Sequence, residues 1–256
     1  MTTTLILSDV HLDPGRPEDY ALVESVIARE AIDALWILGD LFEAWVGDDG
    51  AEQADLRLAA FLCSRPYPIY WTPGNRDFLV GAEFGALCGW ISLSPSQRLN
   101  CGLNLLVRHG DEWCTDDTAY QRFRAEVRTP AWQQSFLQQP LTVRRSIAQE
   151  MRQASQLAQT TARPDILDVT EHSVRVDACD HDAQLVIHGH THRPGLHLNG
   201  SYLRAVTSDW HQAATVIRLI DTASECRVEQ VVCDTNRSSV QATATWQVGS
   251  PEWNLN

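Results

Sequence analysis

Three histidines, His188, His190 and His192, stand at every second position of the segment LVIHGHTHRP (residues 185–194). Imidazole is the commonest metal ligand in proteins because it coordinates as a neutral base near neutral pH. Several imidazoles in one short loop lower the cost of ordering a metal site. The loop follows an apolar run that we expect to form a buried strand. These features indicate a metal site, which would need carboxylate ligands from elsewhere in the chain.

Polar residues that could complete such a site follow four other apolar runs, each expected to form a buried strand. They are Asp9 and His11 after residues 4–8, Asp40 after residues 35–38, Asn75 after residues 68–71, and His109 after residues 103–107. In open parallel sheets, ligands bind at the carboxyl ends of the strands. With His190 and His192 added, the set offers three ligands for each of two metals, with Asp40 as a shared bridging carboxylate. Two cations roughly 3.5–4 Å apart form a clamp for displacement at phosphorus.

The elements that must position these residues follow from apolar periodicity. Segments 17–30 and 51–64 have helical spacing and would connect the first three strands in a parallel sheet. Residues 97–99 are a candidate hairpin partner of the strand at 103–107. After the histidine loop, four short runs (residues 196–198, 202–206, 215–219 and 226–232) predict an antiparallel set that extends a second sheet. The polar tail, residues 236–256, is expected to be an extended edge or a partly disordered end.

Between residues 116 and 178 the strand pattern gives way to helical stretches rich in Gln and Arg, interrupted by Pro130, Pro140 and Pro164. We interpret this segment as a helical insert in a single domain that spans residues 1–256. Its apolar residues, among them Trp132 and Phe136, allow two interpretations. They pack against the core, or they line an apolar groove for a lipid-like ligand.

Composition limits the class of protein and its partners. The 256 residues carry a formal charge of −13 with a pI near 5.0, which argues against nucleic acid as a partner. All 20 basic residues are arginines, so phosphate groups would be bound by guanidinium, metal or backbone amides. Seven cysteines without a C-x-x-C pair indicate a reduced protein. We see no signal peptide or membrane-spanning run. We therefore expect a cytoplasmic protein, favour a monomer, and leave peripheral membrane contact open.

In order along the chain, the motifs SDVH (residues 8–11), GD (39–40), GNRD (74–77), HGD (109–111) and GHTH (189–192) resemble those of the calcineurin-like metallophosphoesterase superfamily. The resemblance implies an α/β fold, namely a four-layer αββα β-sandwich of mixed sheets flanked by helices. It also implies which residues hold each metal. The first set is Asp9, His11, Asp40 and His192, and the second is Asp40, Asn75, His109 and His190.

One residue departs from the superfamily pattern and narrows the choice of family within it: Arg76 stands where many members of the superfamily have a histidine. Arg76, with the segments GDLFEAWVGDD (39–49), GNRDFLVG (74–81), CTDDTAYQRFR (114–124) and IHGHTHRP (187–194), is similar to the UDP-2,3-diacylglucosamine pyrophosphohydrolase family. This likeness implies hydrolysis of UDP-2,3-diacylglucosamine to UMP and 2,3-diacylglucosamine 1-phosphate by a metal-activated water, within lipid A synthesis. It implies two Mn²⁺ ions, with Mg²⁺ or other divalent ions as alternatives. The insert becomes an acyl-chain lid, and the protein is placed peripherally on the cytoplasmic face of the inner membrane.

The same resemblance implies substrate contacts, some of them in the insert. Asp117 matches an aspartate in the TDD run of the family, and Ser155 matches a serine of its insert. Gln159 and Ala162 stand where the family often has a polar residue and then a lysine. We hypothesise that Arg163 replaces the missing cation. The full set of expected substrate contacts is Asn75, Arg76, Asp117, Ser155, Gln159, Arg163 and His190.

Two alternatives stay open. One is a metallophosphoesterase that acts on another phosphodiester or phosphomonoester, because superfamily resemblance does not define the substrate. The other is a metal-bound scaffold without catalysis, although every expected ligand is present. Within the motifs, we expect His188 to face away from the metals. We interpret Glu43, Trp113 and Cys114 as structural neighbours of the site.

Overall fold

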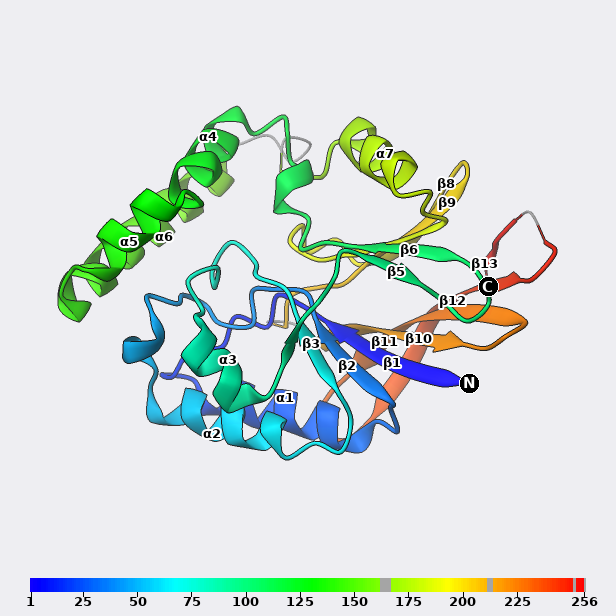
Figure 1. Ribbon diagram of the computed structural model, residues 1–256, viewed down its shortest axis with the longest axis horizontal. Coiled ribbons are helices and arrows are strands. Elements are labelled where there is room, and N and C mark those ends of the chain that lie inside the picture. The colour runs from blue at the N-terminus through cyan, green and yellow to red at the C-terminus, as the bar shows by residue number, and fades with distance from the viewer. Residues whose placement is uncertain (162–166, 211–213, 251, 256) are drawn as a thin grey trace.

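Two mixed β-sheets stack face to face between helices in the computed structural model, which describes residues 1–161, 167–210, 214–250 and 252–255 (Figure 1). Among these residues, the larger sheet has eight strands, in the order β13 (Asn254–Leu255), β12 (Ser238–Gln247), β11 (Glu225–Cys233), β10 (Ala214–Asp221), β1 (Thr2–Leu7), β2 (Ala34–Ile37), β3 (Ile69–Trp71) and β4 (Ile91–Ser92). The smaller has five, in the order β5 (Ser96–Arg98), β6 (Asn104–Val107), β7 (Leu185–His188), β9 (Tyr202–Val206) and β8 (Gly195–Asn199). The expected αββα sandwich is confirmed.

Alternating side chains bury both faces of the larger sheet. Leu5 and Leu7 of β1 pack into an apolar cluster with the helices α1 (Pro17–Arg29), α2 (Gln53–Cys63) and α3 (Ala82–Cys88), which cover the outer face (Figure 1). Ile6 points the other way, into the core between the two sheets. Strands that are buried on both faces read as continuous apolar runs, which is why β1 and β2 were recognisable from sequence.

The smaller sheet follows the same rule. Leu105 and Ile187 face the core between the sheets. Leu106 and Val186 face outward, where they pack with Val174 of α7 (Glu171–Asp180). The sandwich therefore has three apolar layers, one outside each sheet and one between the two sheets.

Parallel strands in both sheets bring five loops to one end of the sandwich. In the larger sheet, β1 pairs with β2 and β2 with β3, all parallel. In the smaller sheet, β6 pairs with β7 in the same way. The loops after these strands are the ones that carry the predicted ligands, so the fold gathers them at the carboxyl ends of the strands.

The insert is helical where the structure describes it. It contains α4 (Thr118–Val127), α5 (Pro130–Leu137) and α6 (Leu141–Thr161), which project to one side of the sandwich, and it ends in α7 (Figure 1). Pro130 opens α5, and Pro140 directly precedes α6, so these prolines stand at helix starts, where they are tolerated. That the insert acts as a lid stays a prediction.

The interpretation of the strands after the histidine loop as one antiparallel set in the second sheet was wrong. The chain divides them: β8 and β9 lie in the smaller sheet, where β9 runs parallel to β7, whereas β10 and β11 lie in the larger sheet. β10 pairs antiparallel with β1. The physical reason is that an apolar run such as β10 can pack in either sheet. Here it pairs with the edge of β1 that β2 leaves free. The helix α3 and the strand β4 were also not anticipated.

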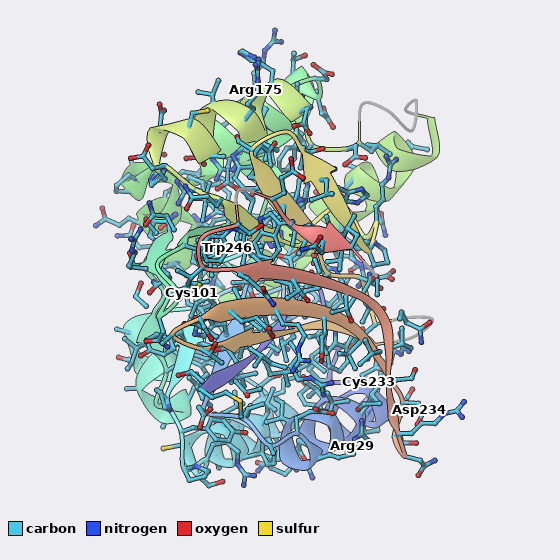
Figure 2. The ribbon with its side chains drawn as sticks, turned by 90° about the vertical axis from the view of Figure 1, so that its right-hand side faces the viewer. Arg29, Cys101, Arg175, Cys233, Asp234 and Trp246 are labelled. Atoms are coloured by element: carbon cyan, nitrogen blue, oxygen red, sulfur yellow. The ribbon has the colours of Figure 1, made fainter. Side chains whose placement is uncertain are left out.

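The polar tail forms the edge of the larger sheet, which is one of the two expected alternatives. β12 pairs with β11 over most of its length, and β13 pairs with β12. Figure 2 shows the turn between β11 and β12 beside Arg29 at the end of α1. The Arg29 guanidinium donates to the carbonyl oxygens of Asp234 (3.1 Å) and Arg237 (3.3 Å). Among the described helices, none is both long and apolar enough to cross a membrane.

Candidate metal centre

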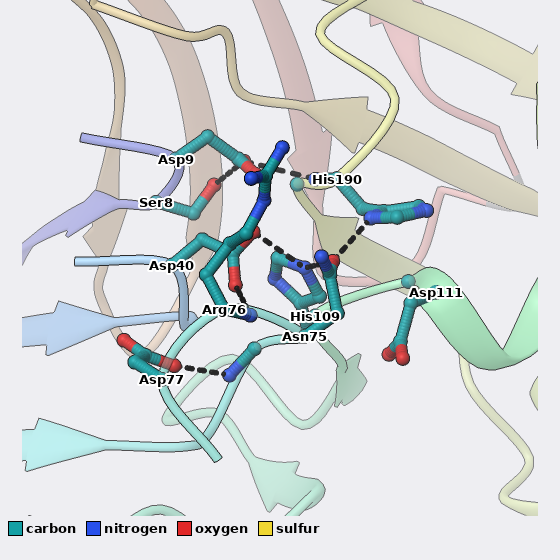
Figure 3. A network of polar contacts seen from close by, with 12 residues as sticks. Ser8, Asp9, Asp40, Asn75, Arg76, Asp77, His109, Asp111 and His190 are labelled. Carbon is teal, nitrogen blue, oxygen red and sulfur yellow. Dashed lines mark hydrogen bonds and ion pairs between the residues drawn. The ribbon is translucent and has the colours of Figure 1, made fainter. Parts of the chain in front are cut away.

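The seven predicted ligands lie together at the carboxyl ends of the strands of both sheets. Figure 3 shows Asp9, Asp40, Asn75, His109 and His190 among them. Asp9 and His11 follow β1, Asp40 follows β2, and Asn75 follows β3, all in the larger sheet. The smaller sheet supplies His109 after β6, and His190 and His192 after β7. The cluster therefore exists only because the two sheets are packed against each other.

Five of these residues have a left-handed backbone conformation, with φ of 54° at Asp9, 56° at His11, 51° at Asp40, 66° at His190 and 54° at His192. Residues other than glycine adopt this region at a cost of roughly 1–3 kcal/mol each, and such residues gather at functional sites. The sharp turns bend each loop immediately after its strand, so that side chains converge across the gap between the sheets.

Two motif glycines are required by close approach. A Cβ at Gly74 would lie 2.1 Å from Oδ1 of Asp40, and a Cβ at Gly189 would lie 2.2 Å from Oδ2 of Asp9. Both distances are far below van der Waals contact. The glycines of the GNRD and GHTH motifs therefore make room for the two carboxylates.

Asp9, His11 and His192 form the first group of candidate ligands, with one ligand atom of each within 4.8 Å of the others. The Nε2 atoms of His11 and His192 are 3.3 Å apart. Oδ1 of Asp9 is buried and has no hydrogen bond among the described residues, with Nε2 of His192 at 3.4 Å. Two imidazole nitrogens and an unsatisfied carboxylate oxygen facing one point are the donor set that a divalent transition metal prefers.

A second group lies on the other side of Asp9. Asp9, Asp40 and His109 again bring one ligand atom each within 4.8 Å. Oδ1 of Asn75 lies 2.9 Å from Nε2 of His109 and 2.8 Å from Nδ1 of His190. The residues present thus fit divalent cations, and Asp9 belongs to both groups.

The carboxylates make the cluster favourable for positive charge. Burial opposes protonation of His109, but Asp40 and Asp9 outweigh it and raise its pKa to about 9. In the same way, burial is outweighed by Asp209 and Asp9 at His192, whose pKa rises to about 10. His190 differs, because burial and the nearby His109 lower its pKa to about 4. A field that stabilises imidazolium would also stabilise a metal cation.

Backbone amides and a hydroxyl orient the carboxylates of Asp9 and Asp40. The backbone N–H of His190 donates to Oδ2 of Asp9 (2.9 Å), and the Ser8 hydroxyl donates to the same oxygen. Oδ1 of Asp40 accepts from the backbone N–H of Arg76 (2.7 Å). Nδ1 of His109 donates to the carbonyl oxygen of Leu38 (2.8 Å), which turns Nε2 toward the cluster.

Of the predicted substrate contacts, some lie near the cluster and others lie outside the described residues. Arg76 lies beside Asp40 at the cluster (Figure 3). Asp117 caps α4 by accepting from the backbone N–H of Tyr120 (2.9 Å), and the Tyr120 ring stacks on His190. Ser155 is exposed on α6. Gln159 belongs to α6, but its side chain lies outside the described residues, and so does Arg163. The contacts of these residues with substrate stay predictions.

His188 is separate from the cluster. Its ring is fully buried, Nδ1 donates to the carbonyl oxygen of Gly189 (2.9 Å), and Nε2 is 3.2 Å from the Arg204 guanidinium. The ring also contacts Trp113 edge-on. Burial, followed by the charge of Arg204, lowers its pKa to about 3, so His188 is neutral.

Glu43 was interpreted as a structural neighbour, yet it touches a predicted ligand. Its Oε2 lies 3.1 Å from Nδ1 of His11. A signal was present in the sequence: a carboxylate inside the apolar run LFEAW is buried only when a partner neutralises it.

Asp209 was also missed, and its Oδ2 lies 3.5 Å from Nδ1 of His192. Asp77, another buried carboxylate, accepts from the backbone N–H groups of Leu41 and Gly74 and ties two ligand loops together.

Comparisons with known proteins are consistent with this geometry. A model of the calcineurin-like phosphoesterase family matches residues 2–194. A UDP-2,3-diacylglucosamine hydrolase of Stenotrophomonas maltophilia (strain K279a) is 40% identical over 234 residues, which are 85% of this chain and 94% of the relative. A protein of the same name from Salmonella typhi is 40% identical over 226 residues, 84% of this chain and 94% of the relative.

Solved structures share the fold at low identity. Vacuolar protein sorting 29 of Cryptosporidium parvum superposes with a TM-score of 0.52 at 8% identity, covering 96% of this chain and 98% of its own. GAP50 of Plasmodium gives 0.53 at 11% identity, covering 97% and 89%. At these identities the likeness concerns the fold alone.

Proposed function

The chain belongs to the calcineurin-like phosphoesterase family and, within it, to the UDP-2,3-diacylglucosamine hydrolases, and we propose that it hydrolyses the pyrophosphate bond of UDP-2,3-diacylglucosamine. The products would be UMP and 2,3-diacylglucosamine 1-phosphate. The observation that carries the proposal is the convergence of Asp9, Asp40, Asn75 and four histidines beside Arg76. The relatives that share 40% identity over most of their length support the choice of substrate.

We assign the ligand sets as the family resemblance implies, and the two groups of neighbouring ligand atoms support this assignment in part. Asp9, His11, Asp40 and His192 would hold one ion, and Asp40, Asn75, His109 and His190 the other. We propose Mn²⁺ for both sites, since oxygen and imidazole donors suit this ion. When bound, two such ions neutralise charge on the pyrophosphate and activate the attacking water.

The side chains of the protein supply binding and orientation. Arg76 would bind a phosphate oxygen through its guanidinium, whose planar fork matches a phosphate group. The carboxylate of Glu43, 3.4 Å from Nη1 of Arg76, holds this guanidinium at the edge of the cluster. Asn75 and His190 would contact the same phosphates, because they lie against each other on the ligand loops.

The insert would bind the lipid part of the substrate. A cavity of about 420 Å³ lies between α6 and the loops after β1 and β2, with Leu12, Phe42, Val46 and Ala148 among its lining residues. We propose this side of the insert as part of the acyl-chain path. Asp117, Ser155, Gln159 and Arg163 would contact the sugar and phosphate as the resemblance implies.

We also propose peripheral contact of a monomer with the cytoplasmic face of the inner membrane. Each helix of the insert exposes an apolar side chain: Phe123 on α4, Leu137 on α5 and Val143 on α6. Such side chains would enter the surface of a bilayer, from which a substrate with two acyl chains must be taken. The side of the membrane is proposed on the family resemblance.

An assay with two substrates tests the function. Purified protein with Mn²⁺ is given UDP-2,3-diacylglucosamine or bis-p-nitrophenyl phosphate, and UMP or p-nitrophenol is measured. We expect UMP to be released at a much higher kcat/KM than p-nitrophenol, and chelation of the metal to stop both reactions. Turnover of the generic ester alone would reject the lipid substrate, and turnover of neither would favour a scaffold.

A further inference from the structure

Glu43 contacts three basic side chains from three parts of the chain. It follows β2 and is 9% exposed. Its Oε2 lies 3.1 Å from Nδ1 of His11, on the loop after β1. Its Oε1 lies 3.4 Å from Nη1 of Arg76, on the loop after β3, and 2.6 Å from Nε of Arg152, on α6 of the insert.

We propose that Glu43 is a positioning residue with two roles: it orients the His11 ring for metal binding, and it anchors α6 to the metal centre through Arg152. The inference rests on the proposed two-metal function. It goes beyond that function, because it assigns a residue outside the metal-binding motifs to the control of one ion and of the insert together.

The first role follows from imidazole chemistry. A carboxylate at Nδ1 favours the tautomer with its proton on that nitrogen, which leaves the lone pair of Nε2 available for a metal. Nε2 of His11 is the atom that faces His192 at 3.3 Å in the first ligand group. Glu43 therefore acts on the nitrogen of His11 opposite to the one that would bind the ion.

His109 differs from His11 in the partner of its Nδ1 atom. Nδ1 of His109 donates to the backbone carbonyl oxygen of Leu38, an acceptor that is kept when any side chain is changed. His11 instead depends on a side chain at this nitrogen. The two ions are consequently supported by different means, and only the ion held by His11 is sensitive to a substitution at position 43.

The second role follows from how α6 is attached. Three arginines of this helix meet carboxylates of the sandwich: Arg144 contacts Asp49, Arg145 contacts Glu52, and Arg152 contacts Glu43. Of these acids, Glu43 has the most buried side chain, at 12% exposure against 65% for Asp49 and 50% for Glu52. Glu43 is also the acid among these three that touches a predicted metal ligand, so the Arg152 pair links α6 to the metal centre.

The contacts agree with both roles. Glu43 is the common partner of His11, Arg76 and Arg152, so a substitution that removes its carboxylate would leave all three basic groups without this partner.

The test compares Glu43→Gln and Arg152→Met with Arg145→Met as a matched control. Arg145 lies on the same helix and makes the same type of ion pair, but its partner Glu52 touches no predicted ligand. The full chain is stripped of metal and titrated with Mn²⁺ by calorimetry, and amide hydrogen exchange of α6 is measured in the same proteins.

We expect Glu43→Gln to weaken one of the two Mn²⁺ sites by roughly 10–100-fold, the effect typical for partners of metal-binding histidines. It should also speed amide exchange in the part of α6 around Arg152. Arg152→Met should speed the same exchange while leaving both Mn²⁺ affinities unchanged. Arg145→Met should change neither. If Glu43→Gln does not fold, Glu43→Asp, which keeps the charge and shortens the side chain, should likewise weaken one site.

Unchanged Mn²⁺ affinity in the Glu43 variant would overturn the first role. Unchanged exchange of α6 in both Glu43→Gln and Arg152→Met would overturn the second. An equal loss of Mn²⁺ affinity in Arg152→Met would mean that the insert, and not Glu43, holds His11. A wild-type chain that binds no Mn²⁺ would instead refute the proposed function.

Discussion

The rings of His188, the last residue of β7, and His190, two residues further on, have different surroundings. His190 meets Asn75 and stacks on Tyr120 within the cluster. His188 is enclosed by Trp113, Arg204 and the backbone of its own loop. Residue type alone does not separate them, because both are histidines, and the left-handed backbone at His190 directs its side chain toward the opposite sheet.

We therefore expect His190→Ala and His192→Ala to lower kcat by more than the ~10–100-fold typical of residues that only orient a ligand. His188→Ala should lower kcat far less, and should lower the free energy of unfolding by about 1–3 kcal/mol because Arg204 loses a buried acceptor. Steady-state kinetics with Mn²⁺ and urea unfolding give both quantities. Equal losses of kcat in all three variants would mean that His188 is a ligand.

His188 also predicts a pH dependence of stability. Its pKa is about 3 in the folded protein and about 6.5 in an unfolded chain. Between these values the unfolded state binds the additional proton, so the folded state loses stability as the pH falls from about 6.5 toward 3. Between pH 7 and pH 5, the wild type should lose about 2 kcal/mol more than His188→Gln, which does not titrate. Equal losses in urea unfolding would show that His188 is accessible to protons.

At this scale, the residue types and their spacing were sufficient to predict which side chains meet. Each predicted ligand follows an apolar run. Because such a run forms a buried strand, its end marks the end of the strand, where the ligand lies. The partners of the ligands were not predictable in the same way. Glu43 and Asp209 lack a motif of their own, and their contacts with His11 and His192 join loops that are distant in sequence.

Single arginine side chains attach helix α6 to the sandwich. The Arg144 side chain is 3% exposed, and its guanidinium donates to Asp49 (2.8 Å) and to the carbonyl oxygen of Val46. Arg145, one residue further, pairs with Glu52 at the surface. The two neighbours thus make a buried and an exposed attachment of the same helix.

Arg144→Met should loosen the first turns of α6, because the carbonyl of Val46 loses a buried donor at a cost of about 1–3 kcal/mol. Amide exchange in residues 141–150 should become roughly 10-fold faster. Arg145→Met should have little effect, since exposed ion pairs contribute about 0–1 kcal/mol. Hydrogen exchange with mass spectrometry compares the three proteins, and equal protection in wild type and Arg144→Met would contradict the attachment.

Periodicity was a reliable guide to elements and a poor guide to their partners. Helices α1 and α2 and strands β1 to β3 lie close to the expected ranges, because each shows its own apolar pattern. The assignment of β10 and β11 to the wrong sheet has a different cause. A strand buried on both faces looks the same in either sheet, and only the long-range pairing of β10 with β1 decides between them.

Both sheets of the molecule supply predicted ligands to the cluster. Asp9 and Asp40 belong to the larger sheet, and His109, His190 and His192 to the smaller. A cation bound between them favours the docked arrangement over the unfolded chain. Metal binding should therefore stabilise the entire sandwich.

With Mn²⁺ at 100 times its dissociation constant, the gain is about 2.7 kcal/mol. For a chain of this size, this gain raises Tm by about 5–10 °C. Differential scanning calorimetry of metal-free and Mn²⁺-loaded protein measures the shift. The Asp40→Asn variant is the control, because it removes the carboxylate that both ligand sets share, and its Tm should rise less. Equal Tm values with and without Mn²⁺ would argue against a site shared by the sheets.

The seven predicted ligands and Arg76 all lie outside residues 116–178, and this division has an evolutionary consequence. If the insert binds the acyl chains as proposed, mutations in it would alter which lipid is accepted while the loops proposed to perform hydrolysis are preserved. Selection can then act on substrate range and on chemistry at different rates. This variation is limited by the arginines of α4 and α6 that meet Asp111, Asp49 and Glu43. A chimera that takes its insert from a relative should keep the insert attached to the sandwich only if it keeps these arginines.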